Sequence, residues 1–271
     1  MSGPLIVDVC GVGLLGPGLP DWASSQALLR EPSRWSPDAT PLAAPALLPA
    51  AERRRAGAIV KLTLAVAEQA CAQAGIDPHE LATVFTSSSG DAANCHALCE
   101  ALAATDRIVS PTRFTNSVHN AAAGYWHIGT ASRAPSTSLC GHDASFPAGL
   151  LEAAVQCVAW QRPVLLVAGD APYPQPLQGV RPLPDAFALA LLLAPSSGGP
   201  ALARLGLPME NDAPVRALGD VRLEALRRAV PAARGLPLLQ ALARREAVTL
   251  LLDDPAHCAL SVDIAPRMQA T

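Results

Sequence analysis

One helix in the sequence has almost no polar side. Residues 146–160 form an apolar run that only Glu152 and Gln156 interrupt, with strand-like runs before it, at 136–140, and after it, at 163–169. A helix that is apolar on nearly every side is buried on nearly every side. Strands that alternate with such helices form a sheet with helices on its faces. The chain is therefore predicted to fold around a sheet that is covered on both faces.

Other parts of the chain extend this alternation. Apolar strand-like runs lie at 5–12, 81–87 and 187–193, and helical patterns at 22–29, 52–74, 90–103 and 120–130. Near-continuous apolar strands are typical of parallel sheets whose two faces are both buried. This order predicts an α/β fold with a mostly parallel sheet covered by helices.

The chain is predicted to consist of one main domain and a tail. Residues 1–195 hold the strand and helix alternation, and residues 196–271 form a shorter C-terminal tail that packs on the same domain. The tail is expected to contain one helix, at 237–245, and two strands, at 248–252 and 258–264.

Composition excludes several classes of protein. Half of the 271 residues are apolar, only 16% are charged, and the net charge is −3. This apolar fraction is too high for a disordered chain. The slightly negative net charge disfavours a nucleic-acid-binding protein, because such proteins are normally basic. No apolar run approaches the ~18 residues of a membrane-spanning helix, and we expect no membrane span.

Cysteine usage indicates a reducing compartment. The seven cysteines are an odd number, and most lie in apolar runs, where a free thiol behaves as a small core residue. We therefore expect a cytoplasmic protein, because disulfides are rare in that compartment.

A glycine motif follows the first strand. Gly11, Gly13 and Gly16 match the G-x-G-x-x-G pattern of dinucleotide-binding proteins. Pro17 and Pro20 follow directly, so no helix begins where its N-terminus would meet a pyrophosphate. A tight glycine turn is the favoured interpretation, and no cofactor is predicted.

Two further clusters favour structural roles. Cys95, His96 and Cys99 lie close together on a predicted helix, but no second pair supplies the four ligands that Zn²⁺ normally needs, so no metal is predicted. Arg53-Arg54-Arg55 begins the helix at 52–74. Cations there oppose the helix dipole, which indicates a solvated helix end or, alternatively, a docking point for an acidic partner.

The most informative segment runs from Ser110 to Val155. In it a short strand leads through the sharp turn Cys140-Gly141-His142-Asp143 into the buried helix. A helix N-terminus lowers the pKa of a thiol placed there, and α/β proteins present nucleophiles in this way.

This segment resembles the nucleophile region of β-ketoacyl synthases, the condensing enzymes of the thiolase superfamily. The resemblance is carried by Ser110-Pro111, Asn120-x-x-x-Gly124 and Arg133-x-Pro135-Ser136. It covers about residues 4–195 and implies the first half of a thiolase-like ketosynthase fold, followed by a short remodelled tail. Family members read Cys-Ala-Ser where this chain reads Asp143-Ala144-Ser145.

More narrowly, residues 116–126 and 143–146 resemble the short, chain length factor-like proteins of aryl polyene and related type II fatty acid or polyketide systems. This resemblance implies a subunit that pairs with a full-length ketosynthase as a heterodimer and shapes its acyl tunnel. The contact is expected around 111–130 and 136–140, and an acyl carrier protein is a further expected partner.

The same resemblance implies that the chain has no catalytic residues. Asp143 replaces the nucleophilic cysteine, where it is expected to cap the helix, and the two histidines of the family's second half are absent. Eight residues are expected to face the partner or its acyl tunnel: Phe114, Asn116, His119, Asn120, Tyr125, Trp126, His142 and Phe146. For Tyr125 and Trp126, a place in the core is an equal alternative, and for His119 the ordering of its loop is favoured over catalysis.

An enzyme is the alternative function. An acyltransferase or thioester hydrolase would use Cys140 or Asp143 together with His119 or His142. A buried, unreactive thiol is the favoured interpretation of Cys140.

Overall fold

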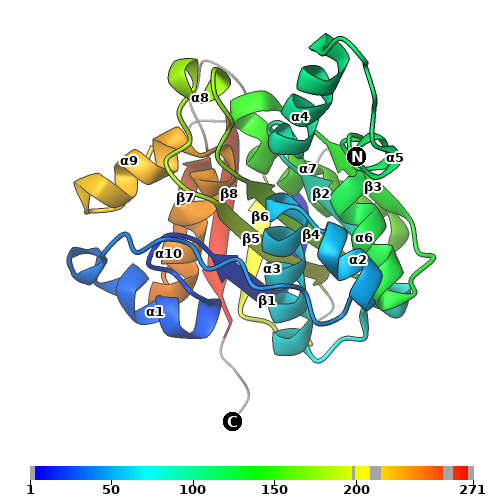
Figure 1. Cartoon of the computed structure of the whole chain (residues 1–271). Coiled ribbons are helices and arrows are strands. Elements are labelled where there is room, and N and C mark those ends of the chain that lie inside the picture. Colours follow the sequence, from blue (N-terminus) through cyan, green and yellow to red (C-terminus); the bar gives the residue numbers. More distant parts are fainter. Residues whose placement is uncertain (1–3, 197–198, 208–214, 253–258, 268–271) are drawn as a thin grey trace.

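A single sheet of eight strands organises the part of the chain that the structure describes (Figure 1). The computed structural model describes residues 4–196, 199–207, 215–252 and 259–267. The strands lie in the order β3-β2-β4-β5-β1-β6-β8-β7. Their bounds are β1 Leu5–Leu15, β2 Ala82–Thr86, β3 Ser136–Leu139, β4 Val164–Asp170, β5 Phe187–Pro195, β6 Ala203–Leu207, β7 Val248–Leu252 and β8 Leu260–Pro266.

Helices cover both faces of this sheet. Their bounds are α1 Trp22–Arg30, α2 Ala50–Arg55, α3 Ala58–Ala74, α4 Ala92–Ala103, α5 Pro111–Thr115, α6 Ala121–Thr130, α7 Ser145–Trp160, α8 Leu177–Val180, α9 Val221–Ala229 and α10 Leu236–Arg244. The side chains of α3 and α6 share one apolar core with one face of the sheet. Those of α1, α7, α9 and α10 share a second core with the other face. The predicted two-faced α/β arrangement is confirmed.

Strand direction differs from the prediction. Within the described residues only the pairs β2–β3 and β2–β4 are parallel, and the other five strand pairs are antiparallel. The expectation of a mostly parallel sheet is therefore wrong. Strand β5 is buried on both faces, as parallel strands usually are. Its apolar run therefore does not indicate whether it pairs in parallel or antiparallel. The connection from β4 to β5, residues 171–186, contains only the four-residue α8, whereas parallel strands are usually joined by a crossover that consists mainly of an α-helix.

The tail continues the same sheet. Strand β6 pairs with β1, from Leu5 opposite Leu207 to Val9 opposite Ala203, and β8 and β7 follow outward. The predicted helix at 237–245 corresponds to α10, whereas β6 and α9 were not predicted. Four of the nine residues of α9 are charged, which hides its apolar side in the sequence. Residues 253–258 lie outside the described residues, so the expected start of the last strand at 258 is not described.

Two glycines of the motif, Gly11 and Gly13, lie inside strand β1, and Gly16 begins the predicted tight turn, in which it exchanges backbone hydrogen bonds with Leu19. A Cβ atom on Gly13 would lie 1.9 Å from the carbonyl oxygen of Val66 in α3, and one on Gly11 would lie 2.1 Å from that of Ala70. The glycines therefore let α3 approach the strand closely. Both the turn and the nucleotide interpretations of these two glycines are replaced by this packing role.

Substituting Gly13 by alanine is expected to destabilise the chain by about 1–3 kcal/mol, because the new methyl group meets backbone that no rotamer change can move. Urea unfolding would measure the change. Gly124→Ala is the matched control, since a Cβ on Gly124 meets nothing within 4 Å and alanine favours a helix by roughly 0.5–1 kcal/mol. Equal stability of the two variants would contradict this account.

Candidate functional site

The turn between β3 and α7 is held by its own polar groups. Ser145 Oγ donates to the carbonyl of His142 (2.7 Å) and accepts from the amide of Gly141 (3.1 Å). His142 has a φ of 53°, in the left-handed region that side chains other than glycine rarely adopt. Residues such as this one, in sparsely populated backbone conformations, cluster at functional sites.

Asp143 forms an ion pair with Arg181, which directly follows α8. The Arg181 guanidinium also lies 5.7 Å from the ring centroid of Tyr173, and His142 Nδ1 lies 3.7 Å from the Asp143 carboxylate. The expected helix cap is wrong: Ala144 is the N-cap residue of α7 and no side chain caps it. A 3-10 turn over His142–Ala144 precedes the helix, so the carboxylate of Asp143 turns toward Arg181.

Cys140 follows β3 and is exposed, so the buried thiol was the wrong interpretation. Its sulfur donates to the carbonyl of Ser88 (3.2 Å) and accepts from the amide of His142 (3.4 Å). In the described part of the chain, no hydrogen bond joins this sulfur to an imidazole. His119 Nε2 instead lies 3.0 Å from the carbonyl of Leu139.

A buried aspartate lies at the end of β4, behind this turn. Asp170 is 1% exposed. It accepts hydrogen bonds from Ser88 N (2.8 Å), Ser88 Oγ (2.7 Å), Ser87 Oγ (3.2 Å) and Ala232 N (2.8 Å). Burial raises the pKa of Asp170, and these hydrogen bonds oppose the rise in part. Sequence reasoning missed this residue, although an acidic residue that ends an apolar strand was a usable signal.

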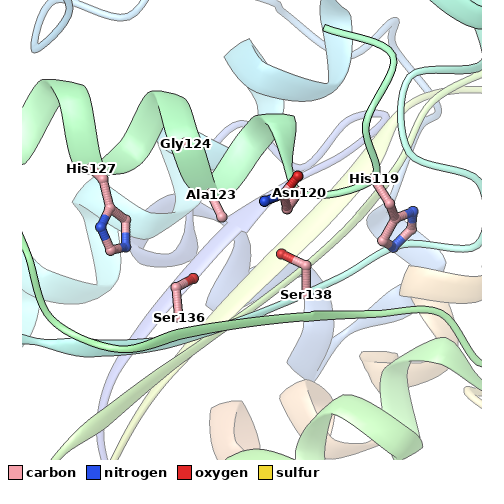
Figure 2. A pocket seen from close by; sticks show the side chains of 7 residues that line it. All are labelled: His119, Asn120, Ala123, Gly124, His127, Ser136 and Ser138. Carbon is pink, nitrogen blue, oxygen red and sulfur yellow. The ribbon is translucent and has the colours of Figure 1, made fainter. Parts of the chain in front are cut away.

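Strand β3 is an edge strand with an open groove beside it. It pairs with β2, and no strand among the described residues pairs with its other side. The groove has a volume of about 490 Å³ and lies between β3 and α6, as Figure 2 shows. Its lining residues are His119, Asn120, Ala123, Gly124, His127, Ser136 and Ser138.

Apolar side chains lie exposed on the helices and the loop next to this strand. Leu151 and Val155 are exposed on α7, which contacts β3 through the hydrogen bond from Gln156 Nε2 to Thr137 Oγ1 (2.8 Å). Ile128 on α6 and Val118 just before α6 are more than half exposed. Exposed apolar side chains gathered along one edge are typical of a protein–protein interface.

The three consecutive arginines end the short helix α2 and do not begin a long helix, because the helical conformation is interrupted at Ala56–Gly57. Cations at a helix C-terminus are stabilised by the helix dipole. Arg53 donates to the carbonyls of Ala46 and Leu48, and Arg55 pairs with Glu52 at 2.9 Å. Arg54 is exposed. The carbonyl of Arg55 accepts from Asn116 Nδ2 (3.4 Å), so α2 lies beside the segment that leads to the groove.

Residues 22–256 match the sequence model described as "Beta-ketoacyl synthase, N-terminal domain". The chain belongs to this family. The resemblance seen in the sequence between Ser110 and Val155 is thereby confirmed.

Solved structures with the same fold include members of ketosynthase complexes. One is the ketosynthase ApeO in complex with its chain length factor ApeC from Xenorhabdus doucetiae (22% identity, TM-score 0.71, 95% of this chain and 98% of that chain covered). A second is the ishigamide ketosynthase/chain length factor (14%, 0.73, 98% and 100%). A third is AntDE:AntF, a type II polyketide synthase acyl-carrier protein in complex with its ketosynthase (12%, 0.74, 98% and 100%). No curated protein matches the chain. The expected thiolase-like ketosynthase fold is confirmed.

The structure separates the eight expected partner-facing residues into two groups. Phe114, His119, Asn120 and His142 are exposed, and Asn116 is partly exposed. Tyr125, Trp126 and Phe146 are at most 5% exposed and belong to the chain's own two cores. Their large apolar rings fill the space between helices and sheet, so these three residues do not face a partner in this structure.

The cysteine–histidine cluster on α4 has local contacts. Cys95 Sγ donates to the carbonyl of Ser117 (3.8 Å), and His96 lies 3.3 Å from Glu100. Within the described ranges no three or more His, Cys, Asp or Glu side chains are placed to hold a metal ion. No helix in the same ranges has the length and apolar character needed to cross a membrane.

Proposed function

We propose that this chain is a non-catalytic, chain length factor-like subunit. It pairs with an active β-ketoacyl-carrier-protein synthase and shapes the acyl tunnel of that enzyme in polyene or fatty acid-type biosynthesis. The ion pair between Asp143 and Arg181 carries this proposal, because the sequence resemblance matches Asp143 to the family's nucleophile.

An aspartate in this position is unsuited to the family's acyl transfer. Its carboxylate is a weaker nucleophile than a thiolate, and the anhydride that it would form hydrolyses readily. The Arg181 guanidinium holds the carboxylate in a charge-assisted hydrogen bond. Acyl transfer would have to break this pair before a bond to carbon could form.

The free edge of β3 is the surface proposed to meet the partner. An edge strand presents unpaired backbone N–H and C=O groups, which natural proteins pair, cover or protect. Here the edge is partly exposed, with a groove on one side and exposed apolar side chains on the helices that flank it. Two of the similar structures are described as a ketosynthase with its chain length factor, which supports a partner of this kind.

The arginines of α2 are proposed to serve a second partner, an acidic acyl carrier protein. Arg54 is exposed and Arg55 is only locally paired with Glu52. One similar structure is described as an acyl-carrier protein in complex with its ketosynthase.

Co-expression with a full-length ketosynthase from the same source tests the main proposal. Native mass spectrometry of the purified material is expected to show a one-to-one heterodimer. A stable monomer or homodimer that leaves the ketosynthase unbound would refute the proposal.

Acyl thioester labelling separates this function from the enzyme alternative. Incubation of the heterodimer with an acyl-carrier-protein thioester is expected to add acyl mass to the ketosynthase and none to this chain. The reason is that Asp143 is held by Arg181 and the Cys140 sulfur contacts the Ser88 carbonyl and not an imidazole. An acyl group mapped to Cys140 or Asp143 by peptide mass spectrometry would favour the acyltransferase or hydrolase instead.

A further inference from the structure

His127 is a residue of the groove whose hydrogen bonding is incomplete among the described residues. It lies on α6, and its ring hangs into the groove near Ser136 (Figure 2). Its Nε2 atom is buried and has no hydrogen-bond partner in the part of the chain that the structure describes. A buried polar atom without a partner destabilises the state that contains it, so a hydrogen-bonding group that reaches this nitrogen on assembly would stabilise the assembled state.

The other polar groups of the groove indicate the chemistry of that group. Ser136 Oγ accepts from Thr83 Oγ1 (2.8 Å), which leaves its own hydroxyl hydrogen free of that bond. Ser138 and Asn120 add a hydroxyl and an amide, and no lining side chain is a carboxylate. A carboxylate only accepts hydrogen bonds, and the hydroxyl, amide and imidazole groups of this groove can each donate one to it.

We infer that His127 and Ser136 receive an acidic side chain, Asp or Glu, of the ketosynthase subunit that covers β3. This inference rests on the proposed function, because the groove lies along the strand edge proposed as the interface. The apolar side chains exposed beside the same edge favour a protein surface over a free small acid as the carrier of the carboxylate. His127 is a positioning residue of the interface and has no catalytic role.

Dissociation of the purified heterodimer on dilution, followed by native mass spectrometry, measures the contact. His127→Leu is expected to raise the dissociation constant about tenfold, equivalent to about 1.4 kcal/mol, since it removes the ring nitrogens. His127→Gln keeps a donor to the carboxylate and is expected to stay close to wild type. His79→Leu, which removes an exposed histidine on the short turn Pro78–Glu80, is the matched control. Thermal melting followed by circular dichroism checks that each variant is folded.

The partner's acidic residues complete the test. Asp→Asn and Glu→Gln substitutions along the ketosynthase face are expected to include one whose effect is not additive with that of His127→Leu. If the wild-type heterodimer forms and His127→Leu leaves its dissociation constant unchanged, this inference is overturned and the proposed function stands. Absence of any wild-type heterodimer would overturn the proposed function itself. A homodimer of this chain that His127→Leu dissociates would show that the occupant is a second copy and not the ketosynthase.

Discussion

Replacing Gly124 by arginine is expected to abolish assembly with the ketosynthase while this chain stays folded. Gly124 lines the groove beside β3 and is exposed, and a Cβ atom at this position would have nothing within 4 Å. Arginine is a better helix former than glycine by roughly 0.8 kcal/mol, so α6 is not weakened. A long charged side chain in the groove would prevent close approach of a partner surface, because interface cores match the packing density of protein interiors.

Native mass spectrometry of the co-expressed pair would show the outcome as loss of the heterodimer peak. Ala72→Arg is the matched control, since Ala72 is an exposed residue of α3 that does not line the groove. It is expected to leave the heterodimer intact. A Gly124→Arg variant that assembles as well as the Ala72→Arg variant would place the partner on another face.

Replacing Asp170 by alanine is expected to destabilise the chain by roughly 3–5 kcal/mol. The change removes the acceptor of four hydrogen bonds, two from groups of Ser88, one from Ser87 and one from Ala232. Each buried donor left without a partner costs about 1–3 kcal/mol. The bond to Ala232 also joins β4 to the tail, so the loss affects both parts of the chain.

Urea unfolding of Asp170→Ala would measure this effect. Asp106→Ala is the control, because Asp106 is an exposed aspartate. Similar stability of the two variants would mean that the Asp170 hydrogen bonds contribute little. The β3–α7 turn is expected to loosen in Asp170→Ala, because Ser88 holds both Asp170 and the sulfur of Cys140.

The raised pKa of Asp170 predicts a dependence on pH. The folded chain holds the Asp170 proton to a higher pH than the unfolded chain, in which the pKa is near 3.8. The contribution of protonated Asp170 to the free energy of unfolding is therefore fully present below about pH 3.8. It is lost as the pH rises through the folded-state pKa. Wild type is expected to lose stability relative to Asp170→Asn, which does not titrate, as the pH increases from about 4. A difference in unfolding free energy between wild type and Asp170→Asn that stays constant across about pH 4–7 would contradict the raised pKa.

Local sequence signals were sufficient for the parts of the fold that depend on local burial. The run at 146–160 identified α7, and the strand before it identified β3, because apolar periodicity reports which sides of a segment are covered. The identity of residue 143 is equally local: the sequence reads aspartate at the position that the resemblance matches to the family's cysteine.

Other features depend on which segments meet, and a linear pattern does not contain that information. The direction of β5, the edge position of β3 and the burial of Trp126 beside the groove-lining His127 all depend on neighbours far away in the chain. Arg181 reaches Asp143 across 38 positions of sequence. Sequence by itself therefore determined most of the elements of residues 1–195 and the aspartate at position 143. Only the tertiary structure decided the strand directions, the ion pair over Asp143 and the open groove, because packing between distant segments sets each of them.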